Sequence, residues 1–169
     1  MIRNFWRKIV FEKQLKKRLH LKQIGVPFKV KKIAIIVDAF TGVESRFFLD
    51  LAKKFKIPEV QISLLLLKGD SKLDKQYQHI FNAEEVDFWG HFKGDLLSFC
   101  ETEYDLLINY YNTQNVLNNL ISVRINHKIS VGFTGADSRI NDLIFDFDPK
   151  DKHTFEIELI KYMHVLNKI

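Results

Sequence analysis

One short stretch constrains the fold more than any other part of the chain. Residues 32–38 read Lys-Ile-Ala-Ile-Ile-Val-Asp, an apolar and largely β-branched run that ends in an acid. The run is too short for a globular helix, and the turn-forming residues Thr41 and Gly42 follow it. A short continuous apolar run of this kind is typical of a strand that is buried on both faces in a parallel sheet.

Strand and helix patterns alternate along the rest of the chain. Apolar runs predict strands at residues 60–67, 106–110, 129–133 and 143–147, with a short one at 86–89. Helical spacing predicts helices over residues 71–81, 95–103, 114–124 and 152–167. A capping box of Thr41 and Glu44 is expected to begin a further helix, and that helix is expected to end before Pro58. This alternation predicts an α/β fold: a doubly wound, mostly parallel, Rossmann-like sheet of five or six strands.

Charge is distributed unevenly between the two ends of the chain. Residues 1–32 hold 11 Lys/Arg and one acid, whereas residues 33–169 hold the other 15 Lys/Arg against 20 Asp/Glu. The net charge is therefore +10 before the first strand and −5 after it. We interpret residues 1–28 as a basic, amphipathic helical arm and residues 29–169 as the α/β domain. A basic segment of this kind indicates a polyanion or an anionic surface as its partner.

The arm allows three interpretations. Apolar residues at helical spacing (Ile2, Phe5, Trp6, Ile9, Phe11, Leu15 and Leu19) permit a helix packed on the domain, an RNA-contacting arm or a helix lying on a membrane surface. In the packed alternative, truncation of Phe5, Ile9, Leu15 or Leu19 is expected to lower stability. In the RNA alternative, the contacts to phosphate are predicted to come from Arg3, Arg7, Lys8, Lys13, Lys16, Lys17, Arg18, Lys22, Lys29, Lys31 and Lys32.

The sequence contains no catalytic or metal-binding constellation that stands out. Neither a G-x-G-x-x-G nor a G-x-x-x-x-G-K-[ST] motif occurs, so no cofactor is indicated. Asp146 and Asp148 form a D-x-D pattern with Asp142 two steps earlier, which we expect to be a solvated acidic edge. Cys100 is expected to be a buried apolar residue. We therefore predict no catalytic residue and no metal ligand, and the sequence favours a protein that is not an enzyme.

The histidines and the aromatic residues at strand ends are expected to have structural roles. The six His show no H-x-x-x-H or H-E-x-x-H spacing, and none has an obvious carboxylate partner on its own helical turn. Phe88 and Trp89 are of a type that stacks on nucleic-acid bases, but at a strand end they are expected to belong to the core.

Three resemblances accompany these patterns. Residues 104–109 (Tyr-Asp-Leu-Leu-Ile-Asn), 117–121 and 129–133 resemble the acceptor-side half of heptosyltransferase-like glycosyltransferases. The whole chain, with its basic start, residues 33–38, Phe88-Trp89-Gly90, residues 105–109 and Asp142-Leu143-Ile144, resembles an uncharacterised bacterial family of small single-domain proteins. It is also similar to a lineage-restricted protein of the large ribosomal subunit, which would imply rRNA and ribosomal proteins as partners.

These observations lead to one expected function and one alternative. We expect a non-enzymatic, ribosome-associated RNA-binding protein that its basic arm anchors to rRNA. The alternative is a glycosyltransferase-like or nucleotide-binding enzyme for a small molecule, with Asp38, Asn109 and Asp146 at its site. No apolar stretch is long enough to span a membrane, and the single Cys favours a cytoplasmic location.

Overall fold

Six parallel strands form one sheet through the middle of the molecule, in a computed structural model that describes residues 2–21, 27–67, 74–81 and 83–169. The strand order is β3-β2-β1-β4-β5-β6. The strands are β1 (Ile33–Asp38), β2 (Ile62–Leu67), β3 (His79–Ile80), β4 (Tyr104–Tyr110), β5 (His127–Phe133) and β6 (Leu143–Phe145). The predicted doubly wound, Rossmann-like α/β fold is therefore confirmed.

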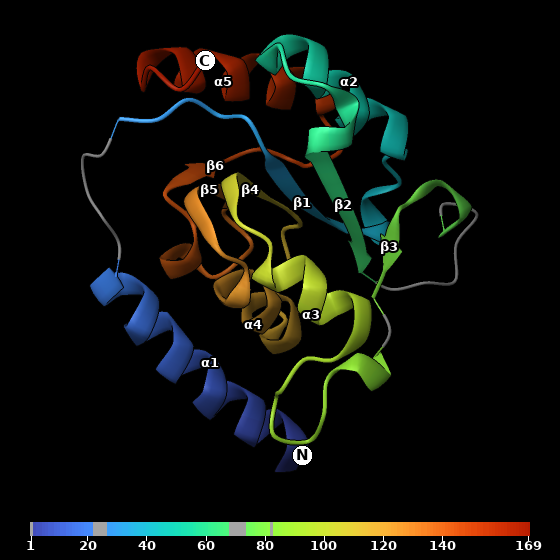
Figure 1. Cartoon of the computed structure of the whole chain (residues 1–169), viewed down its shortest axis with the longest axis vertical. Coiled ribbons are helices and arrows are strands. Elements are labelled where there is room, and N and C mark those ends of the chain that lie inside the picture. The colour runs from blue at the N-terminus through green and yellow to red at the C-terminus, as the bar shows by residue number, and fades with distance from the viewer. Residues whose placement is uncertain (1, 22–26, 68–73, 82) are drawn as a thin grey trace.

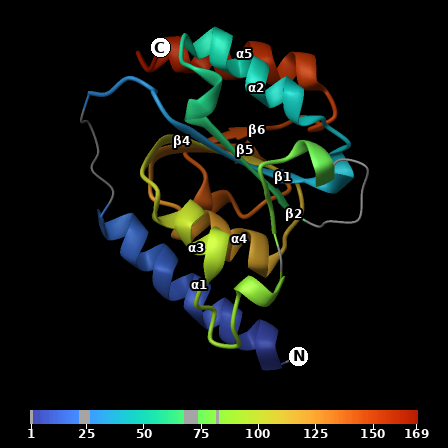
Figure 2. The same ribbon diagram turned by 45° about the vertical axis from the view of Figure 1, so that its right-hand side comes forward.

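Helices cover both faces of this sheet. They are α1 (Ile2–Leu21), α2 (Ser45–Phe55), α3 (Gly94–Glu101), α4 (Val116–Arg124) and α5 (Lys152–Val165). Figure 1 shows α2 and α5 on one face and α3 and α4 on the other, and α1 runs along the outer side of this second layer. The rotated view in Figure 2 shows the same order of layers. The molecule thus has a further helical layer on one side only.

Strand β1 lies at the centre of the sheet, as its composition predicts. It pairs with β2 on one side, where Val37 lies beside Leu66, and with β4 on the other, where Val37 lies beside Tyr110. All six residues of β1 are buried. Alternate residues of the strand enter two separate apolar cores, one under α2 and α5 and the other under α3 and α4. The β-branched run therefore packs on both faces at once.

Three local predictions are wrong. Within the predicted helix 71–81, the described residues form a single turn at Asp74–Gln76 and then β3, because two residues of β3 complete the edge of β2. Residues 86–89 form no strand beyond one bridge between Val86 and Phe92. No capping box begins α2, because Thr41 belongs to a preceding turn that the Asp38 side chain caps at the amide of Phe40.

Helix α1 is held against the α/β unit by both apolar and polar contacts. Phe11 and Leu15 are buried in the core that α4 and the other elements on this face share. Arg139, in the loop between β5 and β6, forms an ion pair with Glu12 at 3.0 Å and lies over the Phe11 ring. The carboxylates of Asp137 and Glu12 keep the pKa of Arg139 above its usual range. One side of α1 is thereby turned inward.

Candidate nucleic-acid interface

The predicted RNA-binding residues separate into groups when the chain folds. Lys8, Lys13, Lys16 and Lys17 are exposed on α1, and we call these four residues the lysine face. Arg7 and Arg18 turn inward on the same helix: Arg7 is buried, and Nη1 of the half-buried Arg18 lies 2.9 Å from Nδ1 of His127. Burial lowers the pKa of Arg18 to about 10, so it stays protonated at neutral pH. Neither arginine reaches the outer surface of α1.

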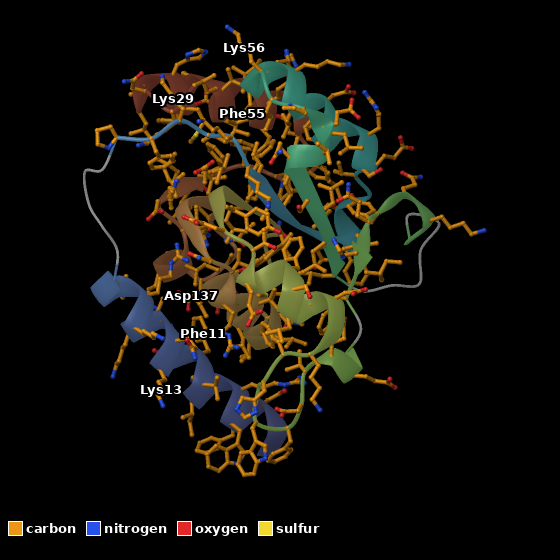
Figure 3. All side chains as sticks on the ribbon, in the orientation of Figure 1. Phe11, Lys13, Lys29, Phe55, Lys56 and Asp137 are labelled. Carbon is orange, nitrogen blue, oxygen red and sulfur yellow. The ribbon has the colours of Figure 1, made fainter. Side chains whose placement is uncertain are left out.

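The remaining basic residues of the predicted set do not join this face. Lys29 lies near the C-terminal end of the chain, where its Nζ donates to Oδ1 of Asn167, and Figure 3 shows it far from Lys13. Lys31, two residues after Lys29, is exposed, while Lys32 is half-buried over the Tyr104 ring. Arg3 lies in the first turn of α1, and Lys22 lies outside the described residues. The lysine face is therefore the part of the set that the fold brings together.

The lysine face differs from several other lysines of the chain in its electrostatic surroundings. Among the residues that the structure describes, no carboxylate lies within ion-pair distance of any of its four ammonium groups. By contrast, Lys53, Lys54 and Lys128 each pair with a carboxylate, at 2.6–2.8 Å. Glu12 is the one acidic residue within α1, and its carboxylate forms an ion pair with Arg139. The positive charge on the outer side of α1 is therefore uncompensated, as an anion-binding surface requires.

An exposed aromatic cluster adjoins the N-terminal half of α1. It consists of Phe5, Trp6, Phe88 and Trp89, whose side chains are between 36% and 62% exposed. Trp6 on α1 meets Trp89 edge-to-face, with ring centroids 5.4 Å apart, so two distant parts of the chain build it. The expectation that Phe88 and Trp89 belong to the core is wrong, because they form the tip of a turn. Two aromatic residues directly before a glycine were the sequence signal for this turn.

The turn that carries Phe88 and Trp89 also contains a pair between a histidine and a carboxylate, outside any helix. Nδ1 of His91 lies 3.0 Å from Oδ2 of Asp87. The amide of His91 donates to Oδ1 of the same Asp87 and lowers the pKa of that carboxyl. The pair closes the turn and belongs to its structure.

A second feature lies where the direction of strand order reverses, beside the carboxyl ends of β1 and β4. A cavity of about 230 Å³, which we call the switch-point cavity, is lined by Asp38, Phe40, Thr41, Asn112, Thr113, Asp148, Pro149 and Lys150. The Asp38 side chain is buried, and its Oδ1 accepts from the amide of Phe40. Open α/β sheets bind their ligands at this position. The lining combines carboxylates, hydroxyls and one ring, which suits a small polar ligand.

The other candidate enzyme residues do not meet Asp38 at this cavity. Asn109 is fully buried and takes part in a core network, with its Nδ2 donating to Oδ1 of Asn141 at 2.7 Å. Asp146 is exposed and accepts from Thr134, and Asp142 accepts from the amide of Ser130. The D-x-D pattern therefore brings only Asp148 to the cavity.

Cys100 has the buried position that the sequence predicts. Cys100 is buried among apolar residues, and this burial raises the pKa of its thiol to about 12. No group of three or more His, Cys, Asp or Glu side chains gathers in a metal-binding arrangement within the described residues. In the same part of the chain, no helix is long and apolar enough to cross a bilayer.

Comparison with known proteins places the chain in a family. The model of DUF6913, described as a family of unknown function, matches residues 3–166. No curated protein and no solved structure matches the chain. The predicted resemblance to an uncharacterised family is thereby confirmed. Since the match includes α1 as well as the whole sheet, the chain belongs to the DUF6913 family.

Proposed function

We propose that the protein binds RNA through the lysine face of α1 and is associated with the ribosome through rRNA. The observation that carries this proposal is the uncompensated charge of Lys8, Lys13, Lys16 and Lys17 on one helix, in a chain whose residues 33–169 have a net charge of −5. Lysines that meet phosphates release condensed counterions, and this release supplies affinity without regard to sequence. The α/β unit supplies the rigid support, since Arg139 and the buried Leu15 fix the rotation of α1.

Replacing the four lysines of the lysine face by Gln is expected to weaken RNA binding and to reduce its dependence on salt. Each lost phosphate contact lowers the slope of log K against log salt by roughly 0.7–0.9, so the slope should fall by about three units. The melting temperature should stay the same, because exposed charges contribute little to stability. Fluorescence anisotropy of a labelled RNA, measured across a series of salt concentrations, gives the slope.

A second quadruple variant provides the matched control. Lys56, Lys75, Lys150 and Lys152 are exposed and lie outside α1, so their replacement by Gln changes the net charge equally. The control should retain the slope of the wild-type protein. Equal slopes for all three proteins would overturn RNA binding by the lysine face. Co-sedimentation with ribosomes at low salt then tests the ribosomal part of the proposal separately.

Small-molecule binding in the switch-point cavity is a second candidate function. The buried carboxylate of Asp38 and the neighbouring Thr41 and Thr113 favour ligands that donate hydrogen bonds, such as the hydroxyls of a sugar or a nucleoside. Two carboxylates, Asp38 and Asp148, line the cavity against the single ammonium group of Lys150, and this excess of negative charge disfavours a bare phosphate in the same space.

Sugars, nucleosides and nucleotide sugars are expected to include at least one compound that raises the melting temperature. A ligand that binds only the folded protein at 100 times its Kd adds about 2.7 kcal/mol to the free energy of unfolding. Asp38→Asn should abolish the increase, whereas Asp146→Asn, which alters a carboxylate outside the cavity, should preserve it. An unchanged melting temperature with every compound at millimolar concentration would contradict this second function.

A further inference from the structure

The aromatic cluster of Phe5, Trp6, Phe88 and Trp89 is an exposed apolar feature beside the lysine face. Its rings form a chain of edge-to-face contacts, with centroids 6.2 Å apart for Phe5 and Trp6 and 5.2 Å apart for Phe88 and Trp89. Packed aromatic rings that remain exposed at the surface usually mark a binding site, because burying them gains free energy.

The turn at residues 87–91 holds its half of the cluster in place. The amide of Asp87 donates to the carbonyl of His91 at 3.0 Å, and the amide of Gly90 donates back to the carbonyl of Asp87. Gly90 has a φ of +81°, and a Cβ at this position would lie 3.5 Å from side-chain atoms of Val10 and Leu120. The turn is thus seated on α1 and α4, so its two aromatic side chains are presented without a further loss of chain entropy on binding.

The cluster and the lysine face follow one another along α1. Trp6 lies about 15 Å from Lys16 at the helical rise of 1.5 Å per residue. The exposed residues Phe5, Trp6 and Ile9 come first along the helix, with Lys8 among them. Lys13, Lys16 and Lys17 follow, and the exposed Leu19 comes after them. A helix that lies on a lipid surface needs an apolar stripe along its whole length. In α1 three lysines interrupt such a stripe between Ile9 and Leu19. An aromatic end followed by a lysine-rich stretch matches a strand of nucleic acid whose bases and phosphates contact different places.

We propose that the aromatic cluster stacks on unpaired bases, so that the RNA bound by this protein is single-stranded where it passes the cluster. This inference rests on the proposed RNA binding and names the class of RNA. Base faces are available only in loops, bulges and single strands, because in a duplex they are covered by their neighbours. Aromatic side chains beside a basic surface are the common means of binding unpaired nucleotides.

Intrinsic fluorescence provides a direct test, because the chain has only two tryptophans and both belong to the cluster. The probes are a single-stranded oligoribonucleotide, an abasic strand with the same number of phosphates, and a duplex of the same length. We expect the single strand to quench tryptophan emission and to bind about 5- to 140-fold more tightly than the abasic strand, the ratio for one stacked base. The duplex and the abasic strand should leave the emission nearly unchanged.

Variants separate the cluster from the lysine face. Trp89→Ala should lower the preference for the single strand over the abasic strand, and Trp89→Phe should restore most of it, since a ring is kept. Tyr162→Ala removes an aromatic ring that is as exposed as Trp6 but lies on α5, and it should leave the preference unchanged. The quenching experiment uses the wild-type protein. It therefore still tests base stacking if the Trp89→Ala protein fails to fold.

The outcomes distinguish this inference from the proposed function. Equal affinity for the single and abasic strands, together with a reduced salt slope in the lysine variant, would overturn stacking and leave RNA binding in place. Loss of binding to every RNA probe would overturn both. A blue shift of tryptophan emission with vesicles of anionic phospholipid, without any quenching by RNA, would assign the cluster to a lipid surface and overturn the inference.

Discussion

Val37→Asp is expected to abolish most of the stability of the fold. Val37 is 0% exposed, lies between β2 and β4, and packs against the core under α2 and α5. A carboxylate at this place would be buried without a partner, at a cost of more than about 5 kcal/mol. Since domains of this size are stable by only about 5–15 kcal/mol, the variant should be largely unfolded at 25 °C. Far-UV circular dichroism during urea titration measures the loss.

The same substitution at an exposed valine is the control. Val60 is 80% exposed in the short turn before β2, and Val60→Asp should change the free energy of unfolding by no more than about 0.5 kcal/mol. A cooperative transition at the wild-type urea concentration in Val37→Asp would mean that β1 is not the central strand.

Leu15→Ala is expected to lower the free energy of unfolding by about 2–5 kcal/mol. Leu15 is 2% exposed and belongs with Phe11 to the core that α3 and α4 cover. Its truncation leaves a cavity between α1 and the α/β unit, which the rigid neighbours fill only in part. Urea unfolding followed by circular dichroism, with linear extrapolation to water, gives the difference.

Leu19→Ala provides the comparison one helical turn further along α1. Leu19 is 55% exposed, so its truncation should have little effect. Equal stabilities of the two variants would show that α1 detaches from the α/β unit before the sheet unfolds. The division into an arm (1–28) and a domain (29–169) stays a prediction, and the burial of Leu15 makes α1 a contributor to the core as well as to the proposed interface.

The sheet was predictable because its strands carry their own signal. The strands β1, β2, β4 and β5 are each built around a short, mostly apolar run, because helices cover the sheet on both faces. The two-residue β3 carries no such signal, because it exists through its pairing with Leu65 and Leu66 of β2. Pairing at the edge of a sheet is a long-range contact, so the local sequence of residues 79–80 does not predict a strand there.

The helical nature of residues 2–21 was likewise predictable, but the side that turns inward was not. Apolar residues occur on both sides of α1, so the periodicity fits either orientation. Contact with α4 and the ion pair between Glu12 and Arg139 select Phe11 and Leu15 for burial. This selection leaves Phe5 and Ile9 exposed, contrary to the packed alternative, and it removes Arg7 and Arg18 from the basic surface.

The sequence by itself therefore determined the α/β class, the central strand and the basic character of the N-terminal helix. Each of these follows from short-range patterns of apolar and charged residues. The tertiary structure decided which lysines share a face, how Trp6 and Trp89 meet, and how Asp38 and Asp148 come to line one cavity. These arrangements join residues far apart in the chain, and their geometry depends on which surfaces pack together, so no local pattern expresses them.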